Sequence, residues 1–273
     1  MKAFKFILVI LSVFLFGYLQ NNAQSVISRQ TNTQKKQVSS QNRTPKKSKQ
    51  LGSNSHINSN PAKAKSKETP ITISDPDGYI NGHGYVDLGL PSGTKWATCN
   101  IGSVSPEDNG NYYAWGETYT KSVYIYSTWR TNDVGGVENS EKTITEKICE
   151  ICDGKNLKPL YDAASVNWGS LWRMPTSGEM TELCEKCIWN WITYKGKKGY
   201  KVVGPNGNTI FLPAAGYYFD TTLEMNDKMG CYWSSTFESI SFTFYVYFRE
   251  DYKPCCSAYG ERTNGYSVRP VVN

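Results

Sequence analysis

The chain has 273 residues, a formal net charge of +6 and eight cysteines, and 14% of its residues are aromatic. The positive charge is concentrated in residues 24–70, which contain ten Lys and Arg and one Glu and leave residues 71–273 with a net charge of −5. The basic character therefore does not belong to the part that can fold, and we expect no nucleic acid as a partner.

The first residues have the pattern of a secretory signal peptide. Lys2 and Lys5 precede an apolar run over residues 6–18, and small and polar residues at 21–24 offer a cleavage site. We predict a signal peptide over residues 1–23 and an exported protein that is periplasmic, on the cell surface or secreted. The apolar run is too short to span a bilayer, so we expect no transmembrane segment in the mature chain. A retained anchor is the alternative.

Residues 24–70 are rich in Lys, Ser, Asn, Gln and Thr and contain no aromatic residue. Such a segment cannot bury enough apolar surface to fold, so we predict a disordered basic tether. Binding of this tether to nucleic acid, acidic polysaccharide or anionic lipid is the alternative to a solvated spacer. Residues 71–273 form one predicted domain, which is long enough to bury roughly 70% of its unfolded surface.

The first half of this domain begins with a turn at residues 75–78 that resembles the start of a calcium loop. The twelfth position is Val86 rather than Glu, which excludes an EF-hand and leaves calcium dependence open. Downstream we expect a strand pair over residues 79–90, a strand over 94–99, a short helix at 106–110, a long loop over 119–160 with one helix near 140–151, and a helix over 161–168.

The central helix has the clearest start signal in the chain. Thr176 and Glu179 have the spacing of a capping box, in which each side chain bonds the backbone amide of the other residue. Met180, Leu183, Cys184 and Cys187 recur at helical spacing, so we expect them on one buried face.

The second half of the domain reads as strands. Asn206-Gly207 between apolar runs predicts a two-residue turn in which both residues have positive φ. Alternation over residues 241–248 predicts a half-buried strand. Expected strands cover residues 189–194, 200–205, 208–213, 231–236, 241–248 and 265–272.

Eight cysteines in an exported protein permit disulfides. Cys149 and Cys152, and Cys184 and Cys187, have C-x-x-C spacing, which allows a four-thiolate zinc site. Core-facing thiols explain the second pair better, and we expect no metal and no cofactor. Cys231, Cys255 and Cys256 suit structural disulfides or free buried thiols.

The chain has no nucleophile elbow, phosphate-binding glycine loop, His-Glu-x-x-His pair or dinucleotide fingerprint. His56 lies in the predicted tether and His83 in a glycine-flanked turn, where we expect it at the surface. The six acidic residues that allow a glycosidase pair, most of them expected as surface charges, are Glu107, Asp108, Glu117, Glu238, Glu250 and Asp251. We predict no catalytic residues and no enzyme activity.

Aromatic residues alternate with Ser, Asn and Gly, which suits the binding of sugars or protein surfaces. For Trp96, Trp168, Trp172 and Trp233 we favour core packing. Tyr217 and Tyr218 are adjacent in a predicted strand, so one of them should face outward.

Several ordered segments resemble the Fibrobacter succinogenes major paralogous domain, a family abundant in exported proteins of gut Bacteroidetes. The segments are 85–100 (YVDLGLPSGTKWATCN), 113–117 (YAWGE), 172–176 (WRMPT), 204–208 (GPNGN), 211–216 (FLPAAG), 232–235 (YWSS) and 267–270 (SVRP). Arg173 to Glu179 also resembles, more distantly, a block of formylglycine-generating (sulfatase-modifying) proteins. The resemblance implies an α+β, C-type-lectin-like fold with twisted antiparallel sheets, two main helices and long loops.

The resemblance favours a non-catalytic binding or surface-interaction module whose ligand is a glycan or a protein. Its expected ligand-binding residues are Tyr217, Tyr218, Asp220, Arg249 and Asp251. Its expected structural residues are Trp172, Arg173, Thr176, Glu179, Trp233 and Arg269. The alternatives are a formylglycine-generating-type thiol enzyme, a carbohydrate hydrolase and a structural cell-envelope protein.

Overall fold

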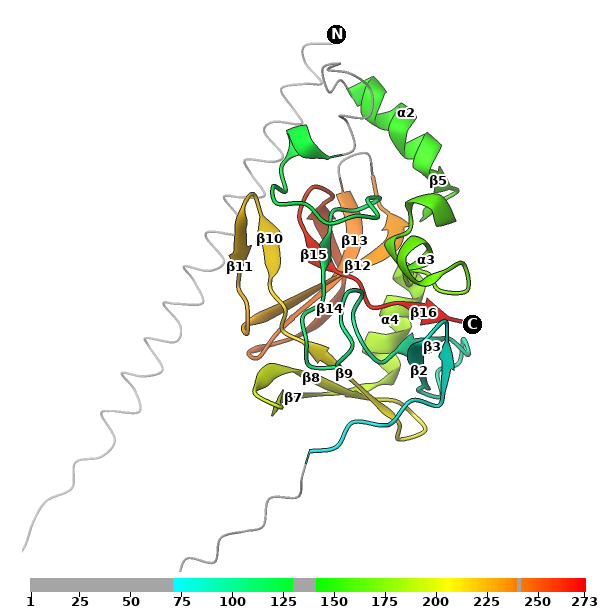
Figure 1. Cartoon of the computed structure of the whole chain (residues 1–273), viewed down its shortest axis with the longest axis vertical. Helices are drawn as coiled ribbons and strands as arrows, with labels where there is room; N and C mark the ends of the chain where they lie inside the picture. Colours follow the sequence, from blue (N-terminus) through cyan, green and yellow to red (C-terminus); the bar gives the residue numbers. More distant parts are fainter. Residues whose placement is uncertain (1–70, 130–140, 240–241) are drawn as a thin grey trace, which may run out of the picture. The chain divides into compact units, whose positions relative to one another are not determined.

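The computed structural model describes residues 71–129, 141–239 and 242–273, which belong to one compact unit (Figure 1). The predicted signal peptide and tether lie outside these residues. Strands dominate and helices are few, which is compatible with the expected α+β class. No helix in the described ranges is both long and apolar enough to cross a bilayer.

The strands form four sheets. The first has the order β1 (Gly78–Ile80), β2 (His83–Asp87), β3 (Lys95–Ala97), β16 (Val271–Val272). The second has the order β7 (Ile188–Tyr194), β8 (Lys197–Val203), β9 (Thr209–Pro213), and the third pairs β10 (Tyr217–Phe219) with β11 (Thr222–Glu224). The largest has the order β14 (Tyr252–Glu261), β13 (Phe242–Arg249), β12 (Met229–Phe237), β15 (Tyr266–Ser267), β4 (Tyr112–Tyr113), with β6 (Asn156–Leu157) beside β12 and β5 (Cys152–Asp153) beside β6.

Three α-helices occur among the described residues, where two main helices were expected: α2 (Glu141–Ile151), α3 (Ala163–Trp168) and α4 (Ser177–Lys186). Two short 3₁₀ helices accompany them, η1 (Tyr126–Thr128) and η3 (Pro159–Tyr161). The predicted helix near 140–151 is confirmed as α2. The prediction for 161–168 is right in part, since α3 begins after Asp162, whose carboxylate caps it through the amides of Ala164 and Ser165. The helix expected at 106–110 is wrong, because those residues form turns.

The β12–β13 hairpin separates two hydrophobic cores. Trp233 on β12 belongs to the first core, and the next residue back, Tyr232, belongs to the second. On β13, Tyr245 packs against the first core while Val246 lies in the second. Because side chains alternate along a strand, both faces of this hairpin are covered. The half-buried strand predicted over 241–248 is confirmed as β13, whose residues alternate between partly and fully buried from Tyr245 to Phe248.

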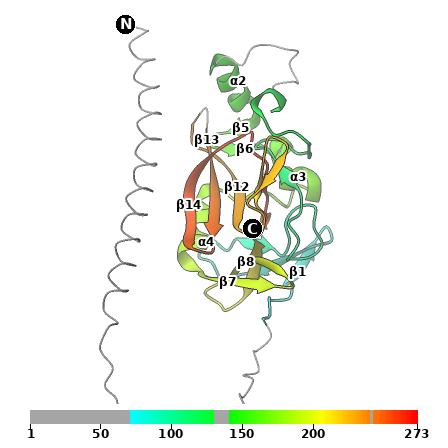
Figure 2. The same cartoon turned by 90° about the vertical axis from the view of Figure 1, so that its left-hand side faces the viewer.

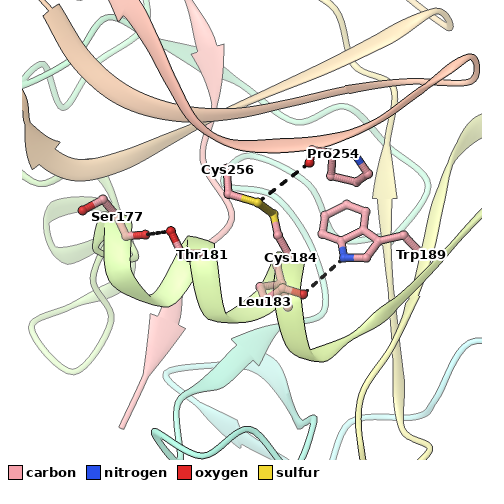
Figure 3. Close-up of a disulfide and its surroundings, with 7 residues drawn as sticks. All are labelled: Ser177, Thr181, Leu183, Cys184, Trp189, Pro254 and Cys256. Atoms are coloured by element: carbon pink, nitrogen blue, oxygen red, sulfur yellow. Dashed lines mark hydrogen bonds between the residues drawn. A yellow bond between two sulfur atoms is a disulfide. The ribbon is translucent and has the colours of Figure 1, made fainter.

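The predicted capping box of α4 is confirmed. The Thr176 hydroxyl accepts from the Glu179 amide, and the Glu179 carboxylate accepts from the Thr176 amide. Met180 and Leu183 are buried, as expected, and Leu183 accepts a hydrogen bond from a Trp189 ring that follows the helix (Figure 3).

A disulfide joins Cys184 on α4 to Cys256 on β14 (Figure 3). β14 is the edge strand of the seven-stranded sheet and lies beside α4 (Figure 2). Cys184 is thus bonded across the fold rather than to its C-x-x-C partner, and Cys187 caps the helix end in an extended conformation. The four-thiolate arrangement requires Cys184 as a thiolate, so the disulfide is incompatible with it.

The turn expected at Asn206-Gly207 has a different form. Val203 pairs with Thr209, and the Gly207 amide donates to the Gly204 carbonyl at 3.0 Å. Only Gly207 has positive φ, so this is a type I turn followed by a left-handed glycine. Five residues instead of two connect the paired strand ends because Pro205 fixes a negative φ at the start of the turn.

The strand expected over 265–272 is split into β15 and β16, which lie in different sheets. Pro270 has no N–H for a sheet ladder, and its carbonyl accepts from Ala97 on β3. β15 also runs parallel to β12, an exception to the expected antiparallel pairing. The strands predicted at 189–194 and 231–236 are confirmed as β7 and β12.

Candidate functional site

A groove lies beside the β1–β2 hairpin. The hairpin turns through Asn81 (φ 50°) and Gly82 (φ 81°), the two positive values that a tight primed turn requires. The Asn81 side-chain amide donates to the Trp168 carbonyl at 2.8 Å, so the turn is attached to the end of α3. This contact brings His83, the first residue of β2, against Trp168, which lies far along the chain.

His83 and Trp168 form the aromatic floor of this groove. Their rings stack with centroids 3.8 Å apart and planes 7° apart, and Trp172 meets His83 edge-on at 6.4 Å. Tyr79 from β1, with 68% of its surface exposed, stands at the side. The groove has a volume of about 380 Å³. This volume is at the small end of the range that small-molecule sites occupy.

The opposite wall comes from two loops. Tyr194 and Lys195 lie at the β7–β8 turn, and Val104, which is 95% exposed, lies on the loop after β3. The Lys195 ammonium pairs with Glu107 at 3.1 Å, which ties the two loops together at the surface. Asp75 and Thr98 add polar atoms to the lining.

The His83 ring offers its nitrogens to a ligand. Partial burial lowers the pKa of His83 below its ordinary value, so the imidazole is neutral at neutral pH. None of the described residues hydrogen-bonds either ring nitrogen. The neutral ring therefore supplies one donor and one acceptor beside an apolar stacking surface. His83 was expected in a surface turn, and its place in a strand on this floor corrects that expectation.

The residues predicted to bind ligand lie elsewhere, and the two tyrosines are packed. Tyr218 contacts Tyr112 and Tyr124 at ring distances of 5.0 and 5.3 Å, while Tyr217 meets Tyr266 edge-on at 5.8 Å. Both tyrosines are half-buried, so the prediction that one of them faces outward is wrong. Other aromatic residues pack on both faces of this strand, so both tyrosines are partly covered.

The other three predicted residues form two separate sets. Asp220 pairs through its backbone with Tyr124. Arg249 forms an exposed ion pair with Asp251 at 3.1 Å, and its carbonyl accepts from Tyr200. In the described part of the chain, no hydrogen bond or ion pair joins Arg249 or Asp251 to the tyrosine pair or to Asp220.

Three of the predicted structural residues, Arg173, Thr176 and Glu179, share a hydrogen-bond network at the start of α4. The Arg173 guanidinium bonds both carboxylate oxygens of Glu179, at 2.6 and 2.7 Å, and Thr94 donates to the same carboxylate. Burial alone would raise the pKa of Glu179, but Arg173, the Thr176 amide and Thr94 together lower it to about 2. Arg173 therefore holds Glu179 ionised beside the start of α4.

Trp172, Trp233 and Arg269 are fully buried. Each tryptophan donates its ring N–H to a backbone carbonyl, that of Ile80 for Trp172 and that of Tyr113 for Trp233. Arg269 donates to four oxygens, those of the Asn100 side chain and the backbone of Ala97, Thr98 and Phe211. The predicted burial of Trp96 and Trp168 is also confirmed.

The residues of the alternative chemistries have structural partners. Glu117 is buried and pairs with Lys121 at 2.8 Å, and Glu250 lies 3.8 Å from Lys198. Cys256 is bonded to Cys184, whereas Cys255 on the same strand has a free thiol. Within the described ranges, no three His, Cys, Asp or Glu side chains gather closely enough to bind a metal ion.

Sequence reasoning placed Trp168 in the core and His83 at the surface, and it did not connect them. The available signal was Asn81-Gly82, a hairpin dipeptide with Tyr79 on one side and His83 on the other. Comparison with protein-family models, curated proteins and solved structures finds no match to this chain.

Proposed function

We propose that residues 71–273 are an exported, non-catalytic binding module that takes a glycan in the groove beside the β1–β2 hairpin. The observation that carries this proposal is the stacked His83–Trp168 floor with the exposed Tyr79 ring beside it. Sugar rings have apolar C–H faces that pack on aromatic rings and hydroxyl groups that need donors and acceptors nearby. The groove offers both kinds of surface.

The sequence supports the remaining parts of the proposal. The signal peptide pattern supports export, and the segments that resemble the major paralogous domain support a C-type-lectin-like form of the α+β fold. A protein surface is the other ligand class, in which case an exposed loop of the partner would fill the same groove. The volume of about 380 Å³ favours one or a few sugar units over a broad protein contact.

The test is a glycan array with the full chain, followed by calorimetric titration of the best glycan. Tyr79→Ala should weaken binding roughly fivefold, because an aromatic contact contributes about 1 kcal/mol. Tyr259→Ala is the matched control, since Tyr259 is 54% exposed and lies outside the groove on β14. That variant should bind like the wild type.

Three results would contradict the proposal. The first is an array with no glycan above background, and the second is a Tyr79→Ala variant that binds as tightly as Tyr259→Ala. The third is hydrolysis of the bound glycan. Hydrolysis would show that the protein is a carbohydrate hydrolase and not a non-catalytic binding module.

A further inference from the structure

Arg262, just after β14, is buried without enough acceptors. Its side chain is 2% exposed, and its guanidinium lies over the Trp129 ring, 5.0 Å from the centroid. Nη2 donates to the Ser239 carbonyl at 3.2 Å. Nε and Nη1 are both inaccessible to solvent, and no described residue accepts a hydrogen bond from either.

The group is charged and has no counter-charge among the described residues. Burial lowers the pKa of Arg262 to about 10, which leaves the guanidinium protonated at neutral pH. No carboxylate of the described residues forms an ion pair with it. The titratable groups that interact electrostatically with Arg262 are Tyr126 and Cys152. Burial raises the pKa of both groups, so both are neutral at this pH.

The Trp129 ring and the Ser239 carbonyl do not compensate the cost of burying the Arg262 charge. An unpaired buried charge is unfavourable because it has lost its hydration, and a ring face and one carbonyl replace only part of that hydration. Two N–H groups remain without acceptors, which adds the cost of unsatisfied donors. An oxygen acceptor that carries negative charge would satisfy the donors and the charge together.

We propose that Arg262 is an anion-binding residue whose free Nε and Nη1 donors bind an oxyanion of the carboxylate, sulfate or phosphate class. Arg262 does not line the glycan groove. The anion-binding proposal and the glycan-binding proposal are therefore independent, and the failure of one does not affect the other. The oxyanion has two possible sources, a free small anion or an acidic group carried by a larger ligand such as a uronic acid.

The test measures thermal unfolding of the full chain at constant ionic strength, with chloride replaced stepwise by sulfate or acetate. The midpoint of the wild type should rise with oxyanion concentration, by roughly 3–5 °C at ten times Kd. Arg262→Met should lose this dependence. Arg249→Met should keep it, because Arg249 is an exposed arginine already paired with Asp251.

A further arm replaces acetate by glucuronate at the same concentration. A larger rise with glucuronate identifies an acidic sugar as the source, and equal rises identify a free anion. In case Arg262→Met fails to fold, the ¹⁵N–¹H signal of Arg262 Nε in the wild type is followed during sulfate titration and should shift to saturation.

The proposal is overturned if sulfate, acetate and chloride give the same midpoint in the wild type. It is also overturned if Arg262→Met retains the full dependence, or if the Nε signal does not move with sulfate. A buried water molecule would satisfy the free donors without any such dependence on the anion.

Discussion

Arg262 and Arg269, two arginines near the end of the chain, are both buried beside aromatic residues. They differ in how many hydrogen-bond acceptors surround the guanidinium. Arg269 donates four hydrogen bonds, to acceptors that lie on β9 and on the segment from β3 to Asn100. Within the described ranges, Arg262 donates one, to Ser239, and two of its nitrogens have no partner. Burial by itself therefore does not reveal whether a charged residue belongs to the framework or to a binding site.

The difference lies in what the neighbouring backbone can offer. Around Arg269, the chain leaves regular pairing at the end of β3, so the carbonyls of Ala97 and Thr98 point to the guanidinium. Around Arg262, the main neighbour is the face of Trp129, which attracts a cation but accepts no directed hydrogen bond from the free nitrogens. A third arginine, Arg173, shows the ion-paired case, with Glu179 as partner.

The largest effect is expected for Arg269→Met. This change leaves four buried oxygens without their donor, and each unsatisfied group costs about 1–3 kcal/mol, so we expect a loss of at least about 4 kcal/mol. Urea unfolding at neutral pH measures it. Arg249→Met, which breaks only an exposed ion pair, should change stability by less than about 1 kcal/mol. Equal losses in the two variants would show that Arg269 is not part of the framework.

An intermediate effect is expected at Glu179. Its folded pKa of about 2 lies below the ordinary 4.5, so its ionised form stabilises the fold above about pH 4.5. This stabilisation, about 3 kcal/mol from the size of the shift, is lost as the pH falls from 4.5 to about 2. Glu179→Gln should therefore be less stable at neutral pH and should lack that part of the pH dependence.

The matched control for this prediction is Glu185→Gln, which removes an exposed carboxylate from the same helix. Unfolding curves between pH 2 and 7 should show the wild-type pH dependence for Glu185→Gln and a flatter profile for Glu179→Gln. Identical profiles for the two variants would show that the Arg173–Glu179 pair does not stabilise the fold.

The smallest effect is expected for Arg262→Met in chloride buffer without oxyanions. Since the substitution removes a buried charge that pairs with no carboxylate in the part of the chain that the structure describes, stability should stay within about 1 kcal/mol of the wild type or rise. Urea unfolding under the conditions used for Arg269→Met gives a direct comparison. A loss as large as that of Arg269→Met would mean that Arg262 is already satisfied, and the contrast between the two residues would fail.

Much of the fold could be predicted because its signals are local. The Thr176–Glu179 capping box lies within one helical turn, and the strand predicted at 231–236 is one short segment, so neither signal depends on distant residues. The errors share a cause. Residues 265–272 read as one strand, yet Pro270 and the burial of Arg269 divide them between two sheets, and that division depends on where β3 and β12 lie.

The candidate site was harder to predict because its residues come together only in three dimensions. His83 reads as a turn residue, and only the contact from Asn81 to the end of α3 brings its ring onto Trp168. The residues selected from aromatic density, Tyr217 and Tyr218, are occupied in packing, since a neighbouring aromatic layer covers them. Density of a residue type does not show which side of a strand is covered.

By itself, the sequence determined the start of α4, strands such as β7 and β12, and the tryptophans of the core, because backbone preference and hydrophobic pattern act over a few residues. The tertiary structure decided the Cys184–Cys256 bond, the stacked floor of the groove and the different surroundings of the two buried arginines. Each of these depends on the distance between segments far apart in the chain. That distance is set when sheets and helices pack, because only then does each donor meet its acceptor or remain without one.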